Sequence, residues 1–247
     1  MRSKEHAAAH ALFSERAVRL AVARGSGRTV ALLGALAKQH GIPASLHGTG
    51  GAWMWVEESA PPERVYNAVR FSLDRKVCNT LNVLVVARAA LERLGPHIER
   101  ALRELNAKVA VVRGSEGTVT SSQSIAEGEL GREWEWDDTP ELSFVVASNL
   151  EHAVSLINEY SPKFVASILS DRDGAFEEFY AAVEAPYVSN GLTRWVDGQW
   201  AWHRPELGLT NWETGRLLGR SGFLSGDDLT SVRDVFLDQT GRAEQKR

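Results

Sequence analysis

Residues 52–87 read AWMWVEESAPPERVYNAVRFSLDRKVCNTLNVLVVA, and their pattern decides the fold. The apolar runs at the two ends, Ala52–Val56 and Leu81–Ala87, have the length and composition of buried strands. Between them, Pro61-Pro62 marks the start of a helix, because proline suits the first turn, where its missing N–H has no intrahelical partner to lose. The stretch therefore predicts a strand, a helix and a second strand in succession.

The helix of this predicted unit has one apolar face. Val65, Val69 and Leu73 follow at intervals of four residues, which places them on the same side of a helix. We expect the helix to run out around Arg75–Cys78, directly before the second strand. The one cysteine of the chain thus falls at a junction between a helix and a strand.

The same alternation extends along the sequence on both sides of this unit. Further strands are predicted at Ala17–Ala23, Lys108–Val112, Glu141–Ala147, Phe164–Leu169 and Tyr187–Ser189. Further helices are predicted at Thr29–Gln39, from Leu91 to Leu102, after a cap at Asn149, and at Gly174–Ala182. Strands that alternate with helices predict an α/β fold, a mostly parallel sheet with helices on both faces.

Three segments interrupt this pattern. Gly95-Pro96 is expected to kink or split its helix, because proline removes a backbone hydrogen bond. The polar stretch 114–138 is expected to be the least structured excursion from the core. Its acidic run, Glu133–Asp138, is expected to be a solvated loop, with a metal site as the alternative. After Gly191, turns rich in Trp, Gly and Arg replace the alternation.

Composition and charge exclude several classes of function. The 247 residues are 43% hydrophobic and 24% charged, which is typical of a globular protein. The net charge of −4 and the lack of a basic stripe argue against a nucleic-acid partner. The longest apolar run, near Asn82–Ala90, is too short to cross a bilayer, and the N-terminus lacks the apolar core of a signal peptide. We therefore expect a cytoplasmic protein without a membrane partner.

Cys78 is the first candidate for chemistry. Junctions at sheet edges are where open α/β folds place reactive groups, and Arg75 and Lys76 are close in sequence. A nearby cation favours the thiolate, which is the nucleophilic form of cysteine. The alternative is a small buried thiol that fills a gap in the core. A single cysteine excludes an internal disulfide, and no HExxH pattern supports a catalytic zinc, so no metal is expected.

Other features also allow two interpretations. The Arg24–Arg28 turn is either a phosphate-binding nest at a helix N-terminus or a plain strand-to-helix turn. His47 either contacts a substrate or is a hydrogen-bonded structural histidine. The tryptophans from Trp134 to Trp212 either line a site or interface or pack under long loops, which is the commoner use.

The segment around Cys78 also resembles a known family. Arg75-x-x-Cys78-Asn79-x-Leu81-x-x-Leu84-x-Val86 is similar to the nucleophile segment of the gamma-glutamyl phosphate reductases, also called glutamate-5-semialdehyde dehydrogenases, within the aldehyde dehydrogenase superfamily. Further stretches resemble the family in the same order: Arg24-Gly25-Ser26, Ile42-Pro43 with His47–Gly50, Glu141–Asn158, Val188–Asn190, Glu206–Thr210 and Arg220–Ser231. The resemblance runs from about Ala21 to about Val235.

The resemblance implies a reaction and a cofactor. In this family, a cysteine thiolate attacks the acyl phosphate of gamma-glutamyl phosphate, phosphate leaves, and hydride from NADPH reduces the resulting thioester to glutamate-5-semialdehyde, an intermediate of proline biosynthesis. Cysteine suits this chemistry because its thiolate is strongly nucleophilic near neutral pH. The backbone N–H of Cys78 is expected to hold part of the oxyanion. The substrate is a small molecule.

The resemblance also assigns residues and segments. It implies a catalytic Cys78, with substrate-binding residues Asn79, His47, Asn190 and Arg220 and cofactor-binding residues Arg24, Gly25 and Ser26. It divides the chain into three segments: a remnant of the cofactor-binding domain (1–43), a catalytic domain (44–205) and a C-terminal segment expected to mediate oligomerisation (206–247).

Two departures from the family pattern leave the function open. The sequence lacks most of the Rossmann-like segment that precedes these motifs in the family, so the chain either is a fragment, pairs with another polypeptide or has lost hydride transfer. We expect a homo-oligomer or a partner chain that supplies the cofactor domain. The loop Trp195–Trp202 replaces a glycine-rich loop that contacts substrate, which predicts a different acyl substrate. The alternatives to the reductase are a pseudoenzyme or assembly subunit, and a cofactor-independent thiol acyl-transferase or esterase.

Overall fold

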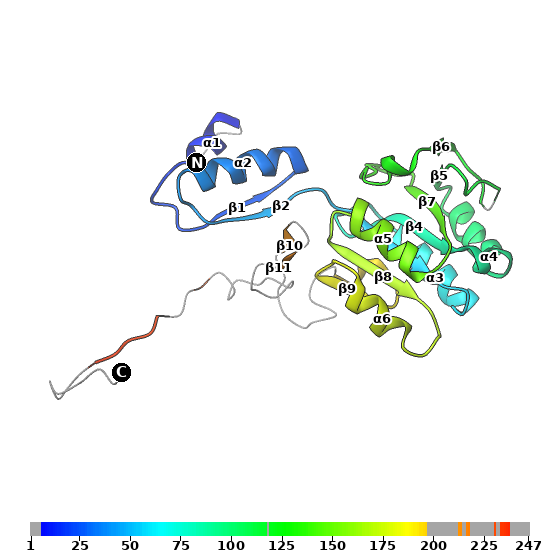
Figure 1. Cartoon of the computed structure of the whole chain (residues 1–247). Coiled ribbons are helices and arrows are strands. Elements are labelled where there is room, and N and C mark those ends of the chain that lie inside the picture. Colours follow the sequence, from blue (N-terminus) through cyan, green and yellow to red (C-terminus); the bar gives the residue numbers. More distant parts are fainter. Residues whose placement is uncertain are drawn as a thin grey trace.

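The chain folds into two units of unequal size, shown in blue and in cyan to yellow (Figure 1). The computed structural model describes residues 6–117 and 119–196, together with 212–213, 216–217, 230 and 233–237. The small unit comprises α1 (His6–Phe13), β1 (Ala21–Arg24), α2 (Gly27–Gln39) and β2 (Ala44–His47). β1 and β2 form a two-stranded parallel sheet, and α2 crosses between them.

The large unit is built on a seven-stranded sheet in the order β6-β5-β7-β4-β3-β8-β9. All neighbouring strands run parallel, which confirms the predicted α/β class. The strands are β3 (Ala52–Val56), β4 (Leu81–Ala87), β5 (Lys108–Val112), β6 (Gln123–Ile125), β7 (Glu141–Ala147), β8 (Val165–Leu169) and β9 (Tyr187–Ser189). Two further short strands, β10 (Trp212–Glu213) and β11 (Arg216–Leu217), pair with each other.

Helices connect the strands of the large sheet. They are α3 (Pro62–Ser72), η1 (Arg88–Ala90), α4 (Leu91–Glu104), η2 (Glu127–Glu129), α5 (Leu150–Tyr160), α6 (Ala175–Ala182) and η3 (Thr193–Val196). The chain moves from β3 through β4 towards β5, then returns from β7 to β8 and β9. Since crossovers between parallel strands are right-handed, this reversal puts α3 and α4 on one face and α5 and α6 on the other.

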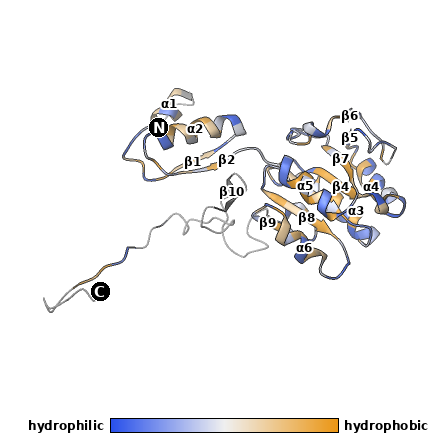
Figure 2. Cartoon of the chain, viewed as in Figure 1, coloured by the Kyte–Doolittle hydropathy of each residue, from blue (hydrophilic) through white to orange (hydrophobic). Residues whose placement is uncertain are grey.

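The core of the large unit lies on its central strands. Every residue of β3 and β4 is buried, and Figure 2 shows hydrophobic residues along the labelled strands β4, β7 and β8. Trp53, Trp55 and Phe144 are the largest fully buried side chains. A parallel sheet with helices on both faces requires such continuous apolar runs, because neither face of a strand meets water.

The helix α3 ends earlier than the sequence predicts. It stops at Ser72, not near Arg75–Cys78, and Leu73 already has non-helical dihedrals. Thr80 takes over the backbone groups that follow: its Oγ1 donates to Arg75 O (2.7 Å) and accepts from Val77 N (2.8 Å). Cys78 therefore lies in a turn of residues 75–80, called the Cys78 turn below, and not at the end of a helix.

Other features also differ from the predictions. β1 begins at Ala21 and not at Ala17. The N–H of Ala21 donates to Pro43 O. α4 runs unbroken through Pro96, because Leu94, Ile98 and the rest of its buried face hold both halves against the sheet. The stretch 114–138 is not merely an excursion, since β6 within it forms the edge of the sheet and Ile125 is buried.

The two sheets separate after β2. The division of the chain at residues 43 and 44 stays a prediction, as does the role of 206–247. In the structure, β2 pairs with β1 and packs with the core of the small unit, so the strand Ala44–His47 belongs structurally with the preceding segment. Residues 48–51, called the Gly loop below, lead from β2 into β3.

Across the described residues, none of the helices combines the length and apolar character needed to span a bilayer.

Candidate active site

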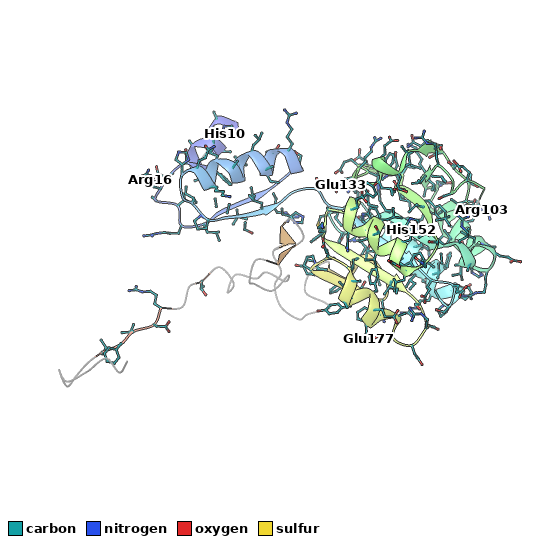
Figure 3. All side chains as sticks on the ribbon, in the orientation of Figure 1. His10, Arg16, Arg103, Glu133, His152 and Glu177 are labelled. Atoms are coloured by element: carbon teal, nitrogen blue, oxygen red, sulfur yellow. The ribbon has the colours of Figure 1, made fainter. Side chains whose placement is uncertain are left out.

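A polar cavity of about 330 Å³ lies where the two units meet. It collects residues from the end of β1, the Gly loop, the Cys78 turn and the acidic run: Arg24, Gly25, Ser26, His47, Gly48, Gly50, Lys76, Val77, Cys78, Glu133 and Glu135. Figure 3 shows Glu133 on the side of the large unit where the chain enters from β2. The fold thus brings together residues more than a hundred positions apart, counting from Arg24 to Glu133.

Cys78 lies half-buried in this cavity. Arg24 Nη2 is 3.9 Å from Cys78 Sγ, so a guanidinium from the small unit faces the thiol of the large one. A guanidinium beside a sulfur stabilises the negative charge of a thiolate. The sequence places Arg75 and Lys76 near the thiol, and the structure adds Arg24, from the end of β1, in contact with the sulfur.

The Gly loop packs directly on the Cys78 turn. Gly51 N donates to Cys78 O (2.8 Å), which ties the two segments together. A Cβ on Gly50 would come within 2.8 Å of Cys78 O and 2.9 Å of Cys78 Cα, closer than side chains approach backbone. Gly51 has φ +103, a conformation that glycine adopts without strain. The glycines of this loop are therefore needed for the approach to Cys78.

His47 ends β2 and is buried against the large unit. Its ring meets the ring of Phe164 edge-on, with centroids 4.9 Å apart. Burial, reinforced by the charge of Arg24 and opposed by that of Glu133, lowers the pKa of His47 to about 4. The imidazole is therefore neutral near neutral pH, and it contributes hydrogen-bonding capacity to the cavity without charge.

Arg24, Gly25 and Ser26 form the exposed turn that precedes α2. Ser26 caps the helix, since its Oγ accepts from Thr29 N (3.4 Å), and Gly25 N donates to His47 O (3.2 Å). All three residues line the cavity beside the first turn of a helix, where backbone N–H groups attract anions. The predicted cofactor residues thus share one cavity with Cys78 and His47.

Asn79 and Asn190 lie outside this cavity lining. Asn79 is buried next to Cys78, and its backbone oxygen accepts from Thr193 Oγ1 (2.8 Å). Asn190 is exposed, and its backbone oxygen accepts from Arg64 Nη2 (2.5 Å). Arg220 lies outside the described residues, so its predicted role is untested.

The predicted substrate loop Trp195–Trp202 is described only at its start. The Trp195 ring packs edge-on against that of Tyr187, with centroids 6.1 Å apart. Tyr187 in turn meets Phe164, so an aromatic row leads from Trp195 to the ring of His47. Cys78 packs against this apolar cluster, which gives the thiol one apolar and one charged side.

Sequence reasoning missed Glu133. The acidic run was expected to be a solvated loop, but the Glu133 side chain is only 18% exposed and pairs with Lys76 Nζ at 2.7 Å. Its other oxygen accepts from Gly50 N (2.7 Å). The only sequence signal was the neighbouring Trp134, which is buried and anchors the run. In the ranges that the structure describes, no group of three or more His, Cys, Asp or Glu is arranged to hold a metal ion.

The chain is similar to curated gamma-glutamyl phosphate reductases. The protein from Mannheimia succiniciproducens is 28% identical over 164 residues, covering 64% of this chain and 38% of the relative. The protein from Enterococcus faecalis is 28% identical over 205 residues, covering 79% of this chain and 46% of the relative. No protein-family model matches the chain.

Solved structures share the fold. The gamma-glutamyl phosphate reductase of Thermotoga maritima has a TM-score of 0.74 at 20% identity, covering 84% of this chain and 50% of that one. A putative methylmalonate-semialdehyde dehydrogenase from Sinorhizobium meliloti, complexed with NAD, has a TM-score of 0.61 at 15% identity, covering 85% of this chain and 51% of that one. The architecture is therefore that of the aldehyde dehydrogenases.

The likeness covers only part of these relatives. The chain spans less than half the length of the two curated relatives above, and half of the Thermotoga maritima chain. Over that span, the sequence comparison and the structure comparison both find proteins named gamma-glutamyl phosphate reductase. The chain is a homologue of the gamma-glutamyl phosphate reductases, with the aldehyde-dehydrogenase-like fold.

Proposed function

We propose that this chain carries the acyl-accepting half of an NADPH-dependent reductase that converts L-glutamyl 5-phosphate, or a related acyl phosphate, to the semialdehyde in proline biosynthesis. The observation that carries the proposal is the approach of Arg24 Nη2 to Cys78 Sγ (3.9 Å) within a polar cavity. The names of the curated relatives support the reaction class. The reducing interior of the cytoplasm suits a reaction that needs a free thiol.

In the first step, the Cys78 thiolate attacks the carbonyl carbon of the acyl phosphate. The C–S bond forms, the C–O bond to phosphate breaks, and phosphate leaves with the electron pair. In this proposal the backbone N–H of Cys78 stabilises the oxyanion of the tetrahedral intermediate. Arg24 stabilises the thiolate before attack and attracts the anionic substrate. The neutral His47 adds a polar group without charge.

The residues of the turn before α2 fit one anionic group of a nicotinamide dinucleotide. Arg24, Gly25 and Ser26 are exposed, and a Cβ on Gly25 would meet nothing within 4 Å, so the turn has room for a phosphate. The first N–H groups of a helix lack intrahelical acceptors, which makes this end suited to an anion. When bound, the cofactor supplies the hydride that reduces the thioester.

The rest of a cofactor site would come from another segment or chain. The two-stranded sheet of the small unit has an exposed apolar residue at Val22, and parallel sheets are usually covered on both faces. We propose that a second copy or a partner chain with a Rossmann-like layer covers this surface. Sedimentation of the purified chain, alone and with a candidate partner, would distinguish a homo-oligomer from a complex.

A second candidate is acyl transfer or ester hydrolysis at Cys78 without a cofactor. The observation that favours it is that Cys78 shares one cavity with Arg24 and His47. Thioester formation requires only these groups, since no electron is transferred in that step. Turnover of an activated ester without nicotinamide would support this candidate over the reductase.

The test of the proposed site uses the full native chain and p-nitrophenyl acetate. Because Cys78 is the one cysteine of the sequence, acylation has one thiol target. We expect a burst of p-nitrophenolate with one acetyl group on the Cys78 peptide by mass spectrometry, and at least about 100-fold less release in Cys78→Ala. Equal release by wild type and Cys78→Ala would reject both candidates and favour the pseudoenzyme.

A further inference from the structure

Glu133 joins the Gly loop to the Cys78 turn. One carboxylate oxygen accepts from Gly50 N (2.7 Å) in the Gly loop, and the other accepts from Lys76 Nζ (2.7 Å) in the Cys78 turn. The side chains of Lys76 and Glu133 are only 11% and 18% exposed, so water screens this pair less than a surface ion pair. One carboxylate thus fixes both walls of the cavity.

The backbone on either side of Glu133 is itself fixed. The side-chain amide of Asn82, in β4, donates to Arg132 O (2.8 Å) and accepts from Trp134 N (2.9 Å). Trp134 Nε1 donates to Ser143 Oγ (2.9 Å) in β7. These bonds attach the acidic run to the central strands, and the carboxylate of Glu133 is therefore presented to the cavity from a rigid base.

The same geometry brings Glu133 close to the thiol residue. A Cβ on Gly50 would lie 2.8 Å from Glu133 Oε1 and 2.9 Å from Cys78 Cα. Both atoms therefore lie against the same side of Gly50. Only glycine fits there, and Gly50 N must point at the carboxylate to keep its bond. A shift of Glu133 would consequently move the Gly loop and the Cys78 turn together.

We propose that Glu133 is a positioning residue for acyl transfer at Cys78, acting through its bonds to Gly50 and Lys76. This inference rests on the proposed function of Cys78. Glu133 holds the Cys78 turn against the Gly loop, so that the thiol and its backbone N–H keep the geometry for attack. It also forms an ion pair with Lys76, whereas Arg24 contacts the sulfur itself.

Because Glu133 has two roles, its removal should change the thiolate fraction and the rate of attack in opposite directions. The titratable and charged groups that face the thiol across the cavity are Arg24, His47, Lys76, Glu133 and Glu135. Loss of the Glu133 charge leaves the more exposed Glu135, 3.9 Å from Lys76 Nζ, to offset Lys76, and so favours the thiolate. Loss of the bond to Lys76 loosens the Cys78 turn and so slows attack, because acyl transfer depends on placement of the nucleophile. A variant with more thiolate yet slower acylation is the signature of a positioning residue.

The experiment compares Glu133→Gln, Glu133→Asp and the matched control Asp137→Asn in the full chain. Asp137 is exposed in the same acidic run, so its variant removes an equal charge from the same loop. Iodoacetamide labelling against pH gives the midpoint at which the Cys78 thiol ionises. The burst with p-nitrophenyl acetate, measured well above both midpoints, gives the acylation rate of the ionised thiol.

We expect Glu133→Gln to lower the labelling midpoint by about one pH unit and to slow acylation about tenfold. Glu133→Asp keeps the charge but has a shorter reach, so it restores the midpoint and only part of the rate. Asp137→Asn matches wild type in both measurements.

Glu133→Gln that behaves as Asp137→Asn in both measurements overturns the proposal. A lower midpoint with an unchanged acylation rate also overturns it, because Glu133 would then act by charge alone. If Glu133→Gln does not fold, slower acylation by Glu133→Asp at an unchanged midpoint carries the test. Should wild type label with iodoacetamide but give no ester burst, the proposed function fails, and slower labelling of the ionised thiol in Glu133→Gln would still show that Glu133 orders the turn.

Discussion

The two parallel sheets of this chain differ in how completely they are covered. In β3 of the large unit all five residues are buried, whereas in β1 of the small unit Ala21 and Ala23 are buried and the alternate residues are exposed. Val22 is 44% exposed and Leu32, on α2, is 60% exposed. The same strand–helix–strand pattern therefore yields a finished core in one unit and a one-sided core in the other.

The difference teaches where the stability and the chemistry lie. The large unit supplies the rigid base, since its central strands hold Asn82 and, through it, Glu133. The small unit supplies Arg24 and His47, which reach the cavity from the ends of β1 and β2. The site is built between a well-packed unit and a sparsely packed one, so changes in the small unit should act on the site with little effect on the large core.

The largest expected effect is a loss of folding stability, which we compare for one core residue of each unit. Phe144→Ala should destabilise the large unit by about 4 kcal/mol, because it leaves a cavity in a fully packed core. Leu33→Ala should cost about 2 kcal/mol and confine its effect to the small unit, where Leu33 belongs to the smaller of the two core clusters.

Urea unfolding separates these two effects. Trp53 and Trp55 report on the large unit, and circular dichroism reports on both units. Phe144→Ala should shift the fluorescence transition, whereas Leu33→Ala should shift only part of the dichroism signal. Identical shifts of both signals in Leu33→Ala would mean that the two units unfold as one.

The next effect concerns His47, whose ring spans the two units. Its pKa is about 4 in the folded protein and 6.5 as a free side chain. Between pH 4 and pH 6.5, the unfolded state therefore binds a proton that the folded state does not. Stability is therefore full above pH 6.5 and falls as the pH drops towards 4, by about 3 kcal/mol at most. Urea midpoints of wild type and His47→Gln between pH 7 and pH 4.5 measure this loss.

His40→Gln is the control for that series, since His40 is exposed at the end of α2. It should keep the wild-type dependence on pH, whereas His47→Gln should show a weaker one. A dependence that is unchanged in His47→Gln would assign the acid sensitivity to other groups.

The smallest effect compares the helix caps of the two units. Asn149 Oδ1 accepts from His152 N at 2.9 Å at the start of α5, whereas Ser26 Oγ accepts from Thr29 N at 3.4 Å at the start of α2. Asn149→Ala should cost about 1 kcal/mol and Ser26→Ala about 0.5 kcal/mol. Thermal unfolding of both variants measures the difference, and a larger loss for Ser26→Ala would contradict the ranking by bond length.

Much of the large sheet was predictable from the sequence. The predicted strands Ala52–Val56, Leu81–Ala87, Lys108–Val112 and Glu141–Ala147 agree with the structure, because buried parallel strands are continuous apolar runs bounded by polar residues. The cap at Asn149 was predictable for a similar reason, since the interaction is local. The end of α3 was not, because the bonds of Thr80 that replace its last turn leave no periodic signal.

The candidate site was only partly predictable. Cys78, His47 and the Arg24–Ser26 turn were identified from residue type and family resemblance, and the structure places all of them around one cavity. Asn190 lies outside its lining, and Arg220 lies outside the described residues. Glu133 was assigned to a solvated loop, because charge patterning alone does not distinguish an exposed carboxylate from one held by a distant amide.

The sequence by itself determined the α/β class, the buried strands, the single candidate nucleophile and the resemblance to the gamma-glutamyl phosphate reductases. These features are encoded in runs of neighbouring residues, where periodicity and residue type suffice. Only the tertiary structure decided that Arg24 faces the Cys78 sulfur and that Glu133 joins Gly50 to Lys76. Those contacts link residues 54 to 83 positions apart, and their formation depends on how the two units pack, which no local pattern records.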